Sequence, residues 1–209
     1  MATEQGPVTQ VAEHEIATRD LAWWGMIFFI ASEALIFANL IAAYLYLEIR
    51  NGGGWVPPTD SGLILPLINT VILLSSSIPA HIAGTAIGRG NQRALRWGFF
   101  LTIILGAIFL GGQFYEYSGL FAHNFTPSTG LTPQAAVFGS SFFTLTGFHG
   151  LHVTVGLIFL IIVLIRAMRG HFTPQKHFAV EAAEMYWHFV DGVWVVVFST
   201  VYLLPLLFR

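Results

Sequence analysis

Ionisable residues inside long apolar runs are the part of this sequence most able to do chemistry. Glu33 lies in one such run, between Ser32 and Ala34. His149 and His152 lie in another, at a spacing of three residues that puts both imidazoles on one face of a helix. Ionisable groups at mid-membrane are costly, so they are usually paired or functional. The sequence therefore predicts a buried polar cluster of Glu33, His149 and His152.

A second set of ionisable residues lies in the last apolar run. Glu184, His188 and Asp191 recur at spacings of four and three, which places them in one stripe along a helix. Further polar residues, Gln113, Glu116 and His81, lie near the ends of other runs. The stripe is the second candidate site.

These residues leave several kinds of chemistry open. A His-x-x-His pair with one Glu could ligate zinc or iron, and His149 or His188 could be an axial haem ligand. A di-iron bundle needs four carboxylates and Glu-x-x-His on each of two helices, whereas this chain has Glu184-x-x-x-His188. A hydrogen-bonded network between helices, or proton handling through Glu33, needs no metal. We predict no metal site and no catalytic residue.

The composition indicates the class of protein in which these ionisable groups are positioned. The chain has 209 residues, of which 10% are charged and 55% hydrophobic, and its mean hydropathy is +0.69. Soluble proteins carry about 25% charged residues. Nine Lys and Arg are too few to coat a phosphate backbone, which excludes a nucleic-acid partner, and the absence of cysteine excludes thiolate sites. A membrane protein is what these numbers describe.

Five runs are long enough to cross a bilayer as helices, which takes about 20 apolar residues. They cover about 21–47, 62–87, 94–117, 135–166 and 183–208, separated by Gly, Pro and Asn clusters. None shows the strict alternation of a barrel strand. The fold class is therefore an all-α, polytopic five-helix bundle over 21–209. Residues 1–20 are predicted to be a polar, cytoplasmic N-terminal tail.

The basic residues predict the orientation. With five spans, seven of the nine basic residues fall on one side, which the positive-inside rule makes cytoplasmic. The N-terminus is then cytoplasmic and the C-terminus outside. Four residues on the cytoplasmic side could bind anionic lipid head groups, or could only set the topology: Arg166, Arg169, Lys176 and His177. Four tryptophans are predicted at the same boundary: Trp23, Trp24, Trp97 and Trp187.

Several blocks resemble the third subunit of haem–copper terminal oxidases, in its five-helix bacterial form and the cytochrome c oxidase branch. The blocks are Ser32-Glu33, GSSFFTLTGFHGLHVTVG (139–156), HFAVEAAEMYWHFVDGVW (177–194), GQFYEY (112–117) and LPLINTVILLSSS (65–77). They extend over nearly the whole chain after the tail. The glutamate at position 33 and the Val180-Glu181-Ala182-Ala183 segment favour cytochrome c over quinol as the electron donor.

The resemblance implies an accessory subunit of a proton-pumping oxidase of aerobic respiration in the bacterial plasma membrane. Family members carry no cofactor of their own; haems and copper lie in the partner subunits. They pack beside catalytic subunit I with subunit II, hold phospholipid, and support proton uptake, oxygen access and durable turnover. A small subunit IV and a respiratory supercomplex are further candidate partners. The longer family form has seven helices, of which this chain lacks the first two.

The resemblance also assigns roles to single residues. Glu33 matches the family's mid-membrane carboxylate, and Arg166 and Lys176 match its lipid contacts. Glu181 joins the last-helix polar stripe, which then comprises Glu181, Glu184, His188 and Asp191. The alternatives are the third subunit of a quinol oxidase, a histidine-ligated membrane metal enzyme, or a small transporter.

Overall fold

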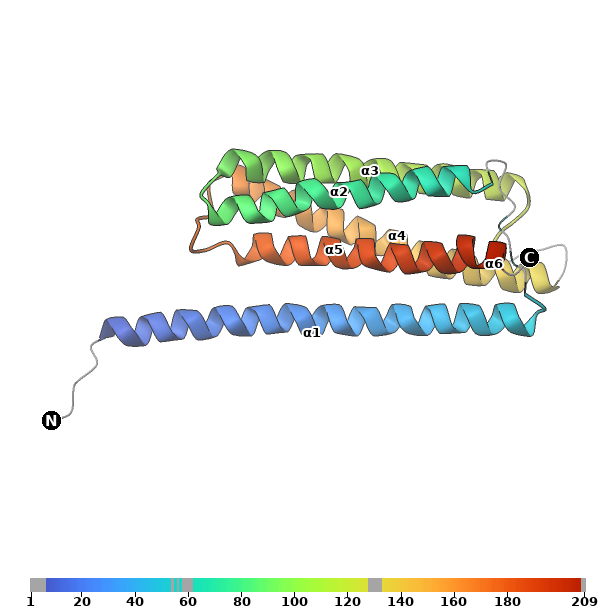
Figure 1. Cartoon of the computed structure of the whole chain (residues 1–209), viewed down its shortest axis with the longest axis horizontal. Coiled ribbons are helices and arrows are strands. Elements are labelled where there is room, and N and C mark those ends of the chain that lie inside the picture. Colours follow the sequence, from blue (N-terminus) through green and yellow to red (C-terminus); the bar gives the residue numbers. More distant parts are fainter. Residues whose placement is uncertain (1–6, 54, 56, 58–61, 128–132, 208–209) are drawn as a thin grey trace.

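The computed structural model describes residues 7–53, 55, 57, 62–127 and 133–207, with side chains from residue 21 on, except at 133–134 and 206–207. Five long helices dominate this part (Figure 1). They are α1 (Pro7–Arg50), α2 (Ile64–Gly88), α3 (Gln92–Ala122), α4 (Pro133–Met168) and α5 (Phe178–Phe198). A π-helical segment, η1 (Ser199–Leu203), and a short α6 (Leu204–Leu207) continue α5.

The five-span, all-helical prediction is confirmed, since all five long helices are apolar enough to cross a membrane. Several helices extend beyond their predicted ends: α3 runs to Ala122 and α5 begins at Phe178. Hydropathy marks the apolar part of a helix, whereas backbone hydrogen bonds continue it into polar sequence. The first helix likewise begins at Pro7, inside the predicted tail. Residues 1–6 and the side chains of 7–20 lie outside the described residues.

Two tight turns at one end of the bundle connect α2 to α3 and α4 to α5. Gly90 and Gly170 have positive φ, +72° and +73°. The amide of Asn91 donates to the Ala86 carbonyl, and the amide of His171 to the Arg166 carbonyl. This six-to-one bond past a left-handed glycine is the Schellman motif, which ends a helix and satisfies its last carbonyls. Both turns therefore need glycine at these positions.

The helices α2 to α5 pack in a ring, α2 on α3, α3 on α4, α4 on α5 and α5 on α2, while α1 packs on α4 and α5. Figure 1 shows α1 lying along one side of the other four. Of the most apolar stretch of α1, 6% is buried, against 33–56% for the other four helices. The first span is therefore the least enclosed part of the bundle.

The four tryptophans predicted at one membrane boundary differ in their exposure. Trp23, Trp24 and Trp97 are exposed, but Trp187 is fully buried. Its indole N–H donates to Ser76 Oγ at 2.8 Å, and Gly106 of α3 leaves the space that its ring occupies. Trp187 is thus a packing residue between α2, α3 and α5, because a polar partner is supplied inside the bundle.

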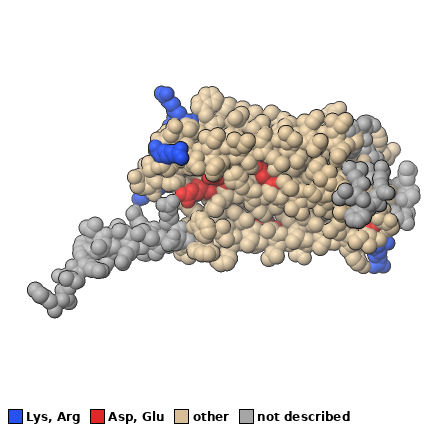
Figure 2. Space-filling view, in the orientation of Figure 1, with Lys and Arg blue, Asp and Glu red and all other residues tan. Residues whose placement is uncertain are grey.

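The basic side chains separate to the two ends of the molecule, with most of them at one end (Figure 2). The α2–α3 turn carries Arg89 and its neighbours, and the α4–α5 turn carries Arg169 and Lys176, whereas Arg50 ends α1 at the opposite end. The asymmetry that the sequence predicted is therefore present along the long axis of the bundle.

Candidate functional site

Two members of the predicted cluster, Glu33 and His152, are in contact in the structure. Glu33 of α1 lies 3.0 Å from His152 Nε2 of α4, through its Oε2. His152 Nδ1 lies 2.8 Å from the Phe148 carbonyl. Because a carbonyl oxygen only accepts, Nδ1 must carry a proton, and Nε2 shares one further proton with the carboxyl of Glu33. This contact connects α1 to α4 in the middle of the apolar region.

His149 differs from the prediction. It is fully buried, but within the described residues neither ring nitrogen has a hydrogen-bond partner. Its ring instead lies among aromatic rings, 4.8 Å from Trp194, 6.0 Å from Phe109 and 6.3 Å from Phe37 between centroids. The two histidines lie about one helical turn apart. His152 faces Glu33, whereas His149 points toward these aromatic rings. The cluster is therefore a pair, with His149 as a neighbour.

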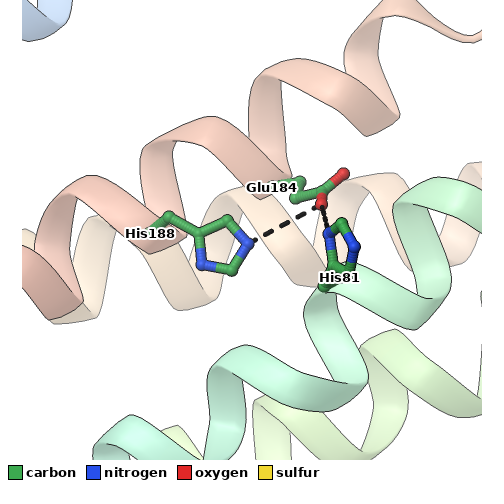
Figure 3. Close-up of side chains that lie close together, drawn as sticks. All are labelled: His81, Glu184 and His188. Atoms are coloured by element: carbon green, nitrogen blue, oxygen red, sulfur yellow. Dashed lines mark hydrogen bonds and ion pairs between the residues drawn. The ribbon is translucent and has the colours of Figure 1, made fainter.

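The last-helix stripe faces α2 for three of its four residues. His188 Nδ1 lies 3.1 Å from Ser77 Oγ, and the Ser77 hydroxyl also donates to Asp191. Glu184 Oε1 lies 2.8 Å from His81 Nδ1 and 3.6 Å from His188 Nε2. Figure 3 shows both imidazoles turned toward the same carboxylate oxygen of Glu184, His188 from α5 and His81 from α2. The two helices are antiparallel, so residues later in α5 contact residues earlier in α2.

Two tryptophans extend the same contact between α2 and α5. Trp187 donates to Ser76 Oγ, and Trp194 donates to Thr70 Oγ1 at 2.9 Å. We call these contacts, with those of Ser77 and His81, the α2–α5 seam. Its polar groups are consistent with interhelical hydrogen bonding as the glue between membrane helices.

Glu181, the fourth member of the stripe, lies apart from the seam. Its Oε1 is 2.9 Å from His177 Nε2, and His177 Nδ1 is 3.1 Å from the Thr173 carbonyl. His177 is buried with both ring nitrogens engaged inside the chain, unlike the other members of the predicted lipid head-group set. The other three members, Arg166, Arg169 and Lys176, are exposed. Arg166 also stacks on the Phe172 ring, 5.2 Å from its centroid.

A further polar network lies toward the opposite end, between α3 and α4. Gln113 Nε2 donates to the Thr146 carbonyl at 3.0 Å and to the Tyr117 hydroxyl at 3.2 Å. Tyr117 in turn lies 2.7 Å from Thr146 Oγ1. The Tyr202 hydroxyl of η1 donates to Glu116 Oε1 at 2.8 Å. The residues Gln113 and Glu116 were visible in the sequence, but their partners were not.

Several residues of the seam could not be recognised from the sequence, because small or aromatic residues are ordinary in an apolar run. Thr70, Ser76 and Ser77 carry the α2 side of the seam, and the LPLINTVILLSSS block that contains them was noted only for its resemblance. His81, noted singly, joins Glu184 and His188. The ligand atoms of these three lie within 4.8 Å of one another, which brings them close enough to hold a metal ion.

Comparison with known proteins gives a consistent result over most of the chain. The family model for cytochrome c oxidase subunit III matches residues 5–205. "Cytochrome c oxidase subunit 3" of Thermostichus vulcanus is 40% identical over 194 residues, covering 92% of this chain and 92% of the relative.

Two further relatives carry the same name. The protein of Synechocystis sp. is 44% identical over 189 residues, which cover 88% of this chain and 76% of the relative. That of Corynebacterium diphtheriae is 43% identical over 183 residues, covering 85% of each. The resemblance predicted from the sequence blocks is therefore confirmed.

Proposed function

The chain belongs to the cytochrome c oxidase subunit III family, and from this membership we propose that it is an accessory, cofactor-free subunit of a proton-pumping cytochrome c oxidase. Its family name places it in a complex with other oxidase subunits, an oxidoreductase assembly. Catalysis, with the haems and copper, belongs in this proposal to subunit I and subunit II. The role of this chain is to stabilise the catalytic subunit and to support proton uptake and oxygen access.

The observation that carries the structural role is how the bundle uses its interior polar groups. Glu33, the three stripe residues Glu184, His188 and Asp191, and Gln113 each contact a side chain or carbonyl of another helix. Such bonds hold membrane helices in one arrangement. A bundle whose few interior polar residues are hydrogen-bonded in this way is suited to be a rigid neighbour of a catalytic subunit.

Lipid binding is the second part of the proposal. A cleft of about 210 Å³ between α1 and α4 is lined mainly by apolar and small residues, among them Leu40, Leu47 and Leu145. Its walls suit a segment of an acyl chain. At the other end, exposed Arg166, Arg169 and Lys176 suit anionic head groups. The two features lie at opposite ends, so they would serve different lipid molecules.

The multi-pass membrane location follows from the five spans. We propose the bacterial plasma membrane, with the basic end and the N-terminus cytoplasmic and the C-terminus outside. The electron donor in this proposal is cytochrome c, in line with the names of the relatives.

Purification of an affinity-tagged full-length chain in a mild detergent tests the proposal. We expect haem-containing partners to co-purify, with oxygen consumption supported by reduced cytochrome c. Activity with a quinol but not with cytochrome c would instead identify a quinol oxidase subunit. Recovery of the chain without any haem protein, under conditions that keep other respiratory complexes intact, would contradict the accessory role.

The division of labour has its own test in Glu33→Ala. We expect the assembled variant complex to retain the haem absorbance spectrum of the wild type, because this chain supplies no haem ligand in the proposal. It should lose subunits or activity faster during turnover, since α1 loses its polar contact with α4. Loss of haem absorbance in a fully assembled variant complex would overturn the cofactor-free role.

A further inference from the structure

We propose that His81, Glu184 and His188 form a binding site for a divalent transition-metal ion, with Zn²⁺ as the ion they fit best. The three residues offer two imidazole nitrogens and one carboxylate oxygen, the ligand types that zinc takes besides thiolate. Zinc is not redox-active. The site would therefore add a structural or regulatory ion to the subunit and no electron-transfer centre.

The distances already approach those of a ligand set. Glu184 Oε1 is 2.8 Å from His81 Nδ1 and 3.6 Å from His188 Nε2, and the ligand atoms of the three residues lie within 4.8 Å of one another. Ligands at about 2.0–2.2 Å from zinc in a tetrahedral site lie about 3.3–3.6 Å apart. Side-chain movements of about 1–1.5 Å would therefore close the set around an ion. The ion would replace the proton shared by Glu184 and His81.

The backbone of α2 leaves room for the carboxylate. A Cβ atom at Gly84, one turn after His81, would overlap the Glu184 carboxyl group. The absence of a side chain at position 84 lets Glu184 lie flat against α2 with an oxygen beside His81. The carboxylate is thus held at the helix contact, and its side chain is only 16% exposed.

A second layer of contacts orients His188. Its Nδ1 lies 3.1 Å from Ser77 Oγ, and Ser77 donates to Asp191. With Nδ1 engaged in this way, Nε2 faces Glu184, as Figure 3 shows. Metal-binding histidines commonly have their second nitrogen held by such a partner. This arrangement distinguishes the site from a chance meeting of surface side chains.

Two of the three side chains lie at the surface of the bundle. The His81 side chain is 66% exposed and that of His188 39% exposed. His81 lies seven residues before the end of α2, about 10 Å along the axis from the basic end of the bundle. Three protein ligands leave a position for water, as in open zinc sites. A bound ion would join α2 to α5 at the end where the two tight turns lie.

Equilibrium dialysis of the purified full-length chain against Zn²⁺, followed by metal analysis, measures binding directly. We expect one Zn²⁺ per wild-type chain. His81→Ala, at an exposed position, and Glu184→Gln should each weaken binding by at least about 100-fold, since loss of an outer-shell partner alone weakens it by about 10–100-fold. Ser77→Ala, which removes such a partner, should weaken it by about 10-fold.

Gly84→Ala is the sharpest variant, because it changes no ligand but fills the space of the carboxylate. We expect it to weaken Zn²⁺ binding as Glu184→Gln does. His171→Ala removes an exposed histidine from the same end of the molecule and should leave the affinity unchanged. Electron paramagnetic resonance of Cu²⁺ bound to the wild type should show two coordinating nitrogens, and one in His81→Ala.

Each outcome decides the proposal. A wild-type chain that binds no Zn²⁺, or whose affinity is the same in all site variants, overturns it. So does binding that is lost in His171→Ala but kept in His81→Ala, which would mark an adventitious surface ion. Circular dichroism of every variant confirms that the helices are intact, and the Cu²⁺ spectrum reports the ligands even where the affinity changes little.

Discussion

The α2–α5 seam and the contact of α1 with α4 are two solutions to the same problem of holding membrane helices together. The seam has polar contacts along its length, from Thr70 with Trp194 at one end to His81 with Glu184 at the other. Among the described side chains, the α1–α4 contact has one polar pair, Glu33 and His152, with Phe37 packed beside it.

The effect of losing one hydrogen bond therefore depends on where in the bundle it lies. In the seam, apolar packing and several polar contacts together hold α2 against α5. Loss of one hydrogen bond should therefore leave the register of the two helices unchanged. Over residues 21–50 the first helix is mostly unburied, and among its described side chains one polar pair joins it to another helix, so we expect that pair to matter more for its position. Three variants test this comparison and a fourth tests the neighbouring contact of α2 with α3; they follow in order of decreasing cost.

Trp187→Ala should have the largest effect. The substitution removes a fully buried ring between α2, α3 and α5 together with its bond to Ser76. Truncation of a buried aromatic residue costs about 3–5 kcal/mol. Unfolding of the full-length chain in a denaturing detergent, followed by circular dichroism, measures the loss. Trp97→Ala, at an exposed position, is the control, and an equal loss there would contradict the packing role.

Gly112→Ala tests how closely α2 and α3 approach. A Cβ atom at Gly112 would overlap the Asn69 amide, whereas none of the described atoms lies within 4 Å of one at Gly111. Overpacking costs about 1–3 kcal/mol. The same unfolding measurement should show Gly112→Ala destabilised and Gly111→Ala unchanged or slightly stabilised. Equal behaviour of these adjacent glycines would show that the two helices can separate freely.

Glu33→Ala should release α1 while leaving the seam intact, at a cost of about 1 kcal/mol. Because the chain has no cysteine, two introduced cysteines can carry spin labels on α1 and α4. We expect a broader distance distribution in the variant. Glu33→Gln should keep the wild-type distribution, since its amide N–H can donate to His152 Nε2. A broad distribution in both variants would show that a charged pair is required.

Thr70→Val should have the smallest effect. The change keeps the shape of the side chain but removes the acceptor for the Trp194 indole. Interhelical hydrogen bonds in membranes average about 0.6 kcal/mol. Unfolding should therefore shift only slightly, and labels on α2 and α5 should keep their distance. A separation of the two helices would mean that the seam depends on single bonds as α1 does.

The sequence predicts the spans well because hydropathy follows directly from the cost of polar groups in a bilayer. It also identifies Glu33, His152 and the stripe residues Glu184, His188 and Asp191, since ionisable residues are rare in apolar runs. Each of these is found in an interhelical contact.

The partners of those residues cannot be predicted from the sequence of one apolar run, because they lie on other helices. Which face of α2 meets α5 is set by packing of all the helices, so His81, Gly84 and Ser77 could not be assigned in advance. The same reason explains the wrong expectation for Trp187. Its residue type is typical of a membrane boundary, but its side chain lies in the core. His149 and His152 share a helix face, yet a small rotation around the axis gives them different neighbours.

The two Schellman turns have a consequence for how the chain enters the membrane during synthesis. Only residues 89–91 connect α2 to α3, so the ends of the two helices are adjacent as soon as both exist. Closing so short a loop costs little entropy. We therefore expect α2 and α3 to leave the translocon together, as a helical hairpin whose polar turn stays on the side proposed to be cytoplasmic.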